Sequence, residues 1–147
     1  MLLKDLGPVV PVVVIDDVSK ADEVASALLA GGIHCVEITL RTDAGLHAIE
    51  RIAALHLPGF IVGAGTVLTR DHLDASVDAG ARFIVSPGLD EQLVERAHSR
   101  GVAVLPGAAT ATEVQRALRL GVETVKFFPA DRLGGLETIA ALAAPFR

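Results

Sequence analysis

The chain has 147 residues, of which 51% are hydrophobic and 21% are charged. This length fits one domain with a sizeable core, built mainly of Val, Ile, Leu and Ala because there are five Phe and no Trp or Tyr. A net charge of −5 argues against a nucleic-acid partner, which would need a basic face. The single cysteine, Cys35, excludes a disulfide framework and a cysteine zinc site, and we expect it to be a small core residue.

Neither membrane insertion nor metal binding is predicted. No apolar run reaches the length of a membrane span, and the opening stretch MLLKDLGPVV lacks the pattern of a cleavable signal peptide. The five histidines are scattered without metal-ligand spacing. We therefore expect a cytoplasmic protein with no membrane partner and no metal.

Six short apolar runs alternate with six helical stretches along the chain. The runs are continuous and rich in Val and Ile, as in strands covered on both faces, which indicates a parallel sheet. We predict strands near 9–15, 34–40, 60–66, 83–87, 103–107 and 124–129. We predict helices near 19–30, 43–55, 70–79, 90–100, 110–120 and 135–143. No linker divides the chain, so we expect residues 1–147 to form a single domain.

The helix boundaries carry capping signals. Glycine most easily adopts the left-handed conformation that follows a helix, and four glycines stand at such places: Gly31, Gly80, Gly101 and Gly121. Residues that can cap a first turn stand at four predicted starts: Ser19, Thr69, Asp90, and Thr110 with Glu113 as a capping box.

Six regular βα units predict an α/β fold, either a (β/α) TIM-type barrel or a doubly wound sheet. The barrel is favoured because several strands end in similar turns of small residues, GAGT, SPGL, LPGA and FFPA. Such turns leave room for a ligand at the carboxyl ends of the strands, where barrel enzymes place their sites. The stretch GAGTVL is not a dinucleotide fingerprint, because Leu68 stands where the third glycine is required.

Four polar side chains lie within or directly after strands that are otherwise apolar. Alternation brings Glu37, Thr39 and Arg41 to one face of their strand, and Lys126 to the same face as Phe128. If Lys126 and Glu37 face the barrel interior, Lys126 in apolar surroundings could act as a neutral nucleophile that forms imines with carbonyl compounds. A nearby Glu can then move protons and an Arg can hold a carboxylate. The pattern alone leaves a second reading open, a structural ion pair beside a solvated arginine.

Six stretches of the sequence resemble, in order, the class I aldolases that cleave 2-keto-3-deoxy-6-phosphogluconate (KDPG) and also handle 4-hydroxy-2-oxoglutarate. The stretches are GPVVPVVVID, GIHCVEITLRT, IVGAGTVL, FIVSPGL, LPGAATATE and VKFFPA, and they span essentially the whole chain. The resemblance implies a (β/α) barrel, a homotrimer and a small 2-keto acid substrate, with no cofactor and no metal.

The resemblance also implies roles for single residues. Lys126 matches the Schiff-base lysine of the family, Glu37 its proton-shuttling glutamate, and Arg41 its binder of the pyruvate carboxylate. Three further matched positions line the pyruvyl pocket or pack beside the lysine: Thr66, Pro87 and Phe128. The implied reaction is cleavage of KDPG to pyruvate and glyceraldehyde 3-phosphate.

Alternatives to this reaction remain at the level of sequence. One is a related aldolase acting on 4-hydroxy-2-oxoglutarate or 2-keto-3-deoxy-6-phosphogalactonate. A phosphosugar epimerase on a similar barrel would not need a strand-borne lysine beside Glu and Arg.

The resemblance predicts only six of the eight βα units of the barrel. Family members continue beyond AAPFR with two more units, whose Gly-Gly and Gly-Ser turns hold the substrate phosphate. Six strands cannot close an eight-stranded barrel, so we expect the first and sixth strands to be open edges unless the fold is rearranged to protect them. We expect the truncated chain to keep the imine-forming residues but to be a poor aldolase by itself. A non-catalytic remnant that needs a complementing chain is a further alternative.

Overall fold

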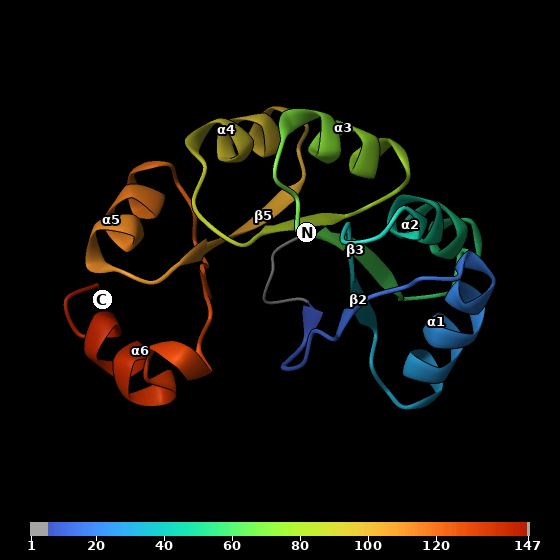
Figure 1. Ribbon diagram of the computed structural model, residues 1–147, viewed down its shortest axis with the longest axis horizontal. Helices are drawn as coiled ribbons and strands as arrows, with labels where there is room; N and C mark the ends of the chain where they lie inside the picture. The colour runs from blue at the N-terminus through green and yellow to red at the C-terminus, as the bar shows by residue number, and fades with distance from the viewer. Residues whose placement is uncertain (1–5, 147) are drawn as a thin grey trace.

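The computed structural model describes residues 6–146 and shows a curled sheet of six strands covered on its outer side by helices (Figure 1). The strands are β1 (Val12–Val13), β2 (Cys35–Thr39), β3 (Ile61–Gly65), β4 (Phe83–Ser86), β5 (Ala103–Ala108) and β6 (Lys126–Phe127). The α-helices are α1 (Ala21–Ala30), α2 (Ala44–Ala54), α3 (Arg70–Asp78), α4 (Glu91–Ser99), α5 (Ala111–Arg119) and α6 (Gly135–Ala143). Two 3-10 turns, η2 (Val18–Lys20) and η3 (Asp131–Leu133), precede α1 and α6.

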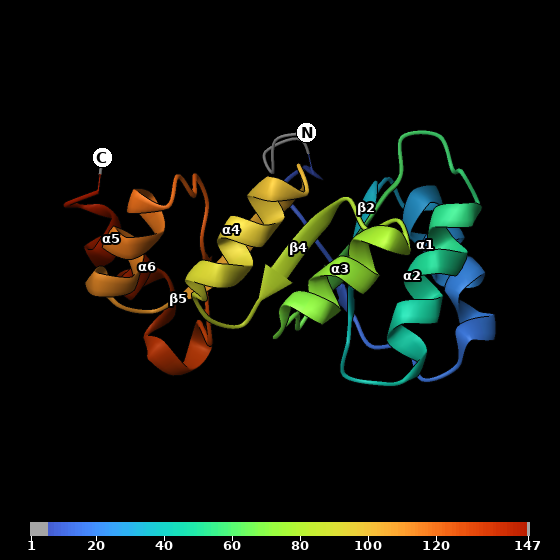
Figure 2. The ribbon, with the colours of Figure 1, turned by 90° about the horizontal axis from the view of Figure 1, so that it is seen from above.

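The strands stand in chain order from β1 to β6, and every neighbouring pair is parallel. The helices follow the sheet as an arc, with α1 and α2 at one end and α5 and α6 at the other (Figures 1 and 2). A doubly wound sheet would carry helices on both faces, so this arrangement is a partial TIM-type barrel, as predicted. Within the described residues, β1 and β6 are the two open edges of the sheet.

Alternation along the strands builds two apolar layers. Val36 and Ile38 of β2 point outward into the main core between sheet and helices. A smaller inner cluster is formed by buried residues on the concave side: Leu6, Cys35, Phe83 and Val85. Cys35 is fully buried there, with its Sγ 3.3 Å from the carbonyl oxygen of Leu6, so its prediction as a small core residue is confirmed.

The two edge strands are shorter than predicted, whereas the central strands and the helices end within two residues of the expected ranges. β1 and β6 each pair on one side only. Pro11 just before β1 and Pro129 just after β6 also lack the N–H that a longer ladder would use. These edges therefore remain extended chain outside the short paired segments.

Three of the four predicted N-caps are confirmed, and one is wrong. The side chains of Thr69, Asp90 and Thr110 accept hydrogen bonds from backbone N–H groups of their helices. Ser19 does not cap α1; its N–H instead donates to Asp17 Oδ1 at 2.9 Å. The chain enters α1 through η2, so the capping residue stands one turn earlier than the pattern suggested.

The glycine prediction also needs one correction. Gly80, Gly101 and Gly121 have positive φ, as expected after helices. Gly31 has a φ of −80°, and its neighbour Gly32 takes the left-handed position with a φ of +80°. Two consecutive glycines made this choice ambiguous in the sequence.

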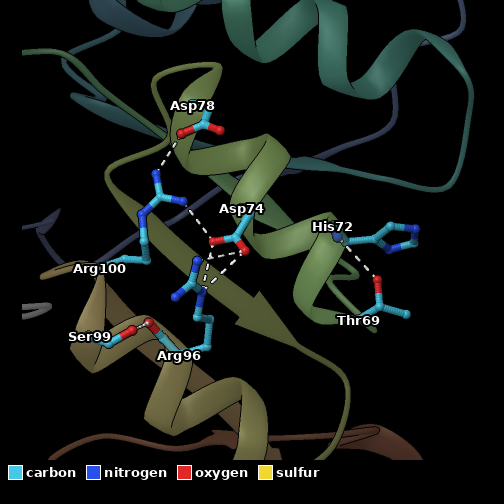
Figure 3. Close-up of polar contacts among 7 residues, drawn as sticks. All are labelled: Thr69, His72, Asp74, Asp78, Arg96, Ser99 and Arg100. Atoms are coloured by element: carbon cyan, nitrogen blue, oxygen red, sulfur yellow. Dashed lines mark hydrogen bonds and ion pairs between the residues drawn. The ribbon is translucent and has the colours of Figure 1, made fainter.

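Helices α3 and α4 are joined on the outer surface by an ion-pair network (Figure 3). Arg96 places Nε and Nη2 at 3.0 and 2.9 Å from the Asp74 carboxylate, and Arg100 Nη1 lies 2.7 Å from it. Arg100 also contacts Asp78 at 2.6 Å. The hydrogen bonds from Arg96 and Arg100 hold the pKa of Asp74 below its ordinary value, although partial desolvation opposes them.

Helix α6 is attached more loosely. It has no buried residue, and Leu136 is 83% exposed. An apolar groove of about 430 Å³ separates it from α5, with Val125 and Phe127 in its lining. None of the described helices is long and apolar enough to cross a membrane.

Candidate active site

Glu37 of β2 and Lys126 of β6 meet on the concave face of the sheet. Lys126 Nζ lies 3.5 Å from Glu37 Oε1. The Glu37 side chain is 4% exposed and that of Lys126 is 24% exposed. The neighbours of Lys126, Val125 and Phe127, line the groove on the opposite side, as alternation predicts. The curl of the sheet thus joins two strands that are distant in the sequence.

Glu37 is a buried carboxyl whose pKa departs from its ordinary value. Burial raises the pKa of the Glu37 carboxyl above its ordinary value, and the positive charges of Lys126 and Arg41 oppose this shift. A carboxyl with a raised pKa holds its proton less weakly than an ordinary glutamate, which favours a role in proton transfer. The 3.5 Å contact is also longer than the roughly 2.7–2.9 Å of a strong charge-assisted hydrogen bond, so the amine is only loosely held.

Two glycines of β3 leave room for side chains of the neighbouring strands. A Cβ at Gly65 would overlap the Oε1 of Glu37, and a Cβ at Gly63 would overlap the ring of Phe83. Any side chain at Gly65 would therefore displace the carboxylate. This role of Gly65 is not among the predictions from the sequence, although the alternating small residues of IVGAG are a visible signal of it.

Arg41 and Thr66 form a second contact at the same rim. Arg41 follows β2, and its Nε donates a hydrogen bond of 3.3 Å to Thr66 Oγ1. Thr66 follows β3 directly and has a φ of +57°. A β-branched residue in the left-handed region stores strain of about 1–3 kcal/mol, and such strain clusters at functional sites.

Phe128 and Pro87 stand at the ends of β6 and β4. The Phe128 ring centroid lies 5.3 Å from Lys126 Nζ, within the range of a cation–π interaction. Pro87 is exposed, and its carbonyl group packs closely against Gly107. A Cβ at Gly107 would overlap the Pro87 carbonyl group. Gly107 is the register partner of Lys126, so Pro87 borders the strand segment beside the lysine.

The structure thus places Lys126 and Glu37 within parallel strands and the other four predicted residues within two positions after the carboxyl ends of such strands. Lys126 contacts Glu37 and lies over the ring of Phe128. Arg41 contacts Thr66, and its charge also acts on Glu37. An amine, a carboxyl with a raised pKa and a guanidinium at one rim can together form an imine, move protons and hold a carboxylate. Among the described residues, no group of three or more His, Cys, Asp or Glu could hold a metal ion.

Comparison with known proteins agrees with this chemistry. The family model for KDPG and KHG aldolases matches residues 2–147. A 2-dehydro-3-deoxy-phosphogluconate aldolase of Zymomonas mobilis is 46% identical over 142 residues, which are 97% of this chain and 67% of that protein.

Solved structures give the same result. A KDPG aldolase of Zymomonas mobilis ZM4 with 3-phosphoglycerate superimposes with a TM-score of 0.91 at 45% identity, over 97% of this chain and 68% of that chain. The KDPG aldolase of Legionella pneumophila, with pyruvate captured at low pH as a covalent carbinolamine intermediate, gives 0.91 at 38% identity and the same coverage. The chain spans about two thirds of the length of these relatives. It therefore belongs to the KDPG and KHG aldolase family.

Proposed function

We propose that the chain carries the pyruvate half of a metal-independent Schiff-base aldolase that cleaves KDPG to pyruvate and glyceraldehyde 3-phosphate. The observation that carries the proposal is the contact of Lys126 with Glu37, a buried carboxyl with a raised pKa. The names of the similar proteins and the pyruvate carbinolamine of the Legionella structure support it.

Lys126 is the proposed nucleophile. Its neutral amine attacks the C2 carbonyl to give a carbinolamine, which takes up a proton and loses water to leave a protonated imine. Glu37 takes the proton of the C4 hydroxyl while the C3–C4 bond breaks, and the bonding electrons move to the iminium nitrogen. Glyceraldehyde 3-phosphate leaves, and the remaining enamine takes a proton at C3 from Glu37. Hydrolysis of the imine then releases pyruvate and restores the amine.

The other rim residues hold the substrate in this proposal. Arg41 binds the substrate carboxylate through its guanidinium, and the hydrogen bond to Thr66 fixes the direction of that side chain. Pro87 and Phe128 line the pocket for the pyruvyl group, and the ring of Phe128 covers one side of the Lys126 amine.

The direct test is borohydride reduction in the presence of pyruvate, followed by peptide mass analysis. We expect one adduct, on Lys126, and its complete loss in Lys126→Met. The matched control is Lys20→Met, because Lys20 also contacts a carboxylate at 3.5 Å but is 60% exposed on the outer surface. An unlabelled Lys126 in folded protein, or equal labelling of both lysines, would contradict the proposal.

Substrate and assembly need separate measurements. Cleavage rates for KDPG and for unphosphorylated 4-hydroxy-2-oxoglutarate show which 2-keto acid the chain prefers. The proposal includes a homotrimer in the cytoplasm, as expected from the family. Light scattering coupled to size-exclusion chromatography tests the homotrimer, and a mass of one or two chains would contradict it.

A further inference from the structure

The hydroxyl of Thr39 has no partner in the structure as described. Thr39 is the last residue of β2 and is 0% exposed, and its Oγ1 makes no hydrogen bond to any described residue. A buried hydroxyl without a partner is costly, because it has lost its bonds to water and gained none in return. Such groups are rare in folded proteins and call for a physical explanation.

Thr39 lies on the same face of β2 as Glu37. The two residues are separated by one position in β2, so they project from the same face of the strand. Thr39 is also the register partner of Gly65 on β3. The Glu37 carboxylate occupies the space that a Cβ of Gly65 would fill, so it lies next to the end of β2 from which the Thr39 side chain projects.

We propose that Thr39 is a positioning residue whose hydroxyl donates a hydrogen bond to the Glu37 carboxylate once Lys126 has formed an imine. This inference rests on the proposed function. In the free chain Lys126 Nζ donates one hydrogen bond to Glu37 Oε1, at 3.5 Å. In the protonated imine the same nitrogen is bound to the substrate carbon and keeps one N–H, in the plane of the C=N bond, so it cannot turn toward Glu37 as a free amine does. The Thr39 hydroxyl, on the same face of β2, donates to the carboxylate in its place.

The hydrogen bond has a defined effect on proton transfer. When Glu37 removes a C3 proton from the pyruvate imine, the C–H electrons form the C2–C3 double bond and the imine electrons move to nitrogen. Thr39 holds the carboxylate in position for this step and stabilises its charged form. Loss of the hydroxyl slows C3 proton transfer because the carboxylate is no longer held in position. It also raises the pKa of Glu37 in the imine, because hydrogen bonding to a charged carboxylate lowers its pKa.

The test compares Thr39→Val and Thr39→Ser with the wild type. Valine keeps the shape of threonine and removes only the unpartnered hydroxyl, so we expect the Tm of Thr39→Val to be unchanged or higher. Deuterium exchange into the methyl group of pyruvate, followed by NMR, reports proton transfer. Borohydride trapping on the same samples reports imine formation. We expect Thr39→Val to trap pyruvate like the wild type. Its exchange of the pyruvate methyl protons should be slower, by up to roughly tenfold, and the pH midpoint of exchange should shift upward. Thr39→Ser restores the rate.

The outcomes separate the two proposals. If the wild type neither traps pyruvate nor exchanges its methyl protons, the proposed function fails and the role of Thr39 with it. If the wild type does both and Thr39→Val exchanges at the same rate, only the role of Thr39 is overturned. Equal losses of trapping and exchange in Thr39→Val, or a Thr39→Ser variant as slow as Thr39→Val, also overturn it. In those cases the threonine acts on imine formation or through its methyl group.

Discussion

Asp74 and Glu37 are carboxylates that each meet cationic side chains, but on opposite sides of the sheet. Asp74 lies on the outer surface with a side chain that is 29% exposed, and two arginines contact it at 2.7–2.9 Å (Figure 3). Glu37 lies on the concave face with a side chain that is 4% exposed, and one lysine stands 3.5 Å away. The pKa of Asp74 is lowered, whereas that of Glu37 is raised.

The difference separates a structural ion pair from the pair that is reactive in the proposed function. Guanidinium groups that donate several hydrogen bonds keep Asp74 charged and join α3 to α4. Glu37 is buried and, among the described residues, accepts a hydrogen bond at its carboxylate from Lys126 alone, and a long one, so burial raises its pKa and makes a change of charge easier. The same pair of residue types can therefore stabilise a helix contact or serve proton transfer, depending on desolvation and on the number of donors.

The largest expected difference between the two regions is in the rate of proton transfer. Glu37→Gln should lower methyl exchange of pyruvate by about 10²–10⁴-fold, because the amide cannot accept the proton. Borohydride trapping on Lys126 should persist. Asp74→Asn is the matched control and should leave exchange unchanged. Equal exchange in wild type and Glu37→Gln would show that the concave pair is structural too.

Gly65→Ala tests whether the position of the carboxylate matters as much as its charge. The new Cβ would overlap Glu37 Oε1 and displace it, and a misplacement of about 1 Å can cost about 10²-fold in rate. Gly63→Ala is the control, because its Cβ strikes Phe83 instead. We expect it to lower the Tm while exchange per folded molecule is retained. If both variants lose exchange to the same extent, general disturbance of β3 explains the effect.

The pH dependence of exchange should report the raised pKa of Glu37. Glu37 accepts a proton only when deprotonated, so exchange should fall as the pH drops through a midpoint above the ordinary glutamate value of 4.5. Asp74→Asn should show the same midpoint. A midpoint at or below 4.5 in the wild type would contradict the effect of burial.

The smallest expected effect is on stability, and its sign differs between the regions. The lowered pKa of Asp74 contributes stability that is present above the ordinary value of 3.8 and is lost as the pH falls through the folded-state pKa. Asp74→Asn should therefore lower the Tm modestly at neutral pH, less so in high salt, and not at the lowest pH.

The raised pKa of Glu37 means that stability falls as the pH rises from 4.5 through its folded-state pKa. Glu37→Gln should remove this pH dependence, as thermal unfolding at several pH values can show. A pH dependence retained in Glu37→Gln, or a Tm of Asp74→Asn equal to that of the wild type at neutral pH, would contradict these assignments.

The regular features of the fold could be predicted because they depend on local rules. The six βα units are indicated by three local signals. These are the continuous Val- and Ile-rich runs, the helix caps such as Thr69 and Asp90, and the glycines after helices. The errors fell where neighbours compete for one role, as with Ser19 and Asp17 or Gly31 and Gly32. The lengths of β1 and β6 were missed because an edge strand depends on a partner and not on its own propensity.

The sequence by itself determined the strand alternation that puts Lys126, Glu37 and Arg41 on defined faces, and its motifs resembled those of the aldolases. Only the tertiary structure decided that the lysine and the glutamate touch, because contact depends on the curl of the sheet between β2 and β6. It also decided that the Glu37 carboxylate occupies the space beside Gly65, that the backbone of Thr66 is strained, and that the Thr39 hydroxyl is buried without a partner among the described residues. Overlap, strain and desolvation are properties of atoms brought together from distant parts of the chain, and no local pattern encodes them.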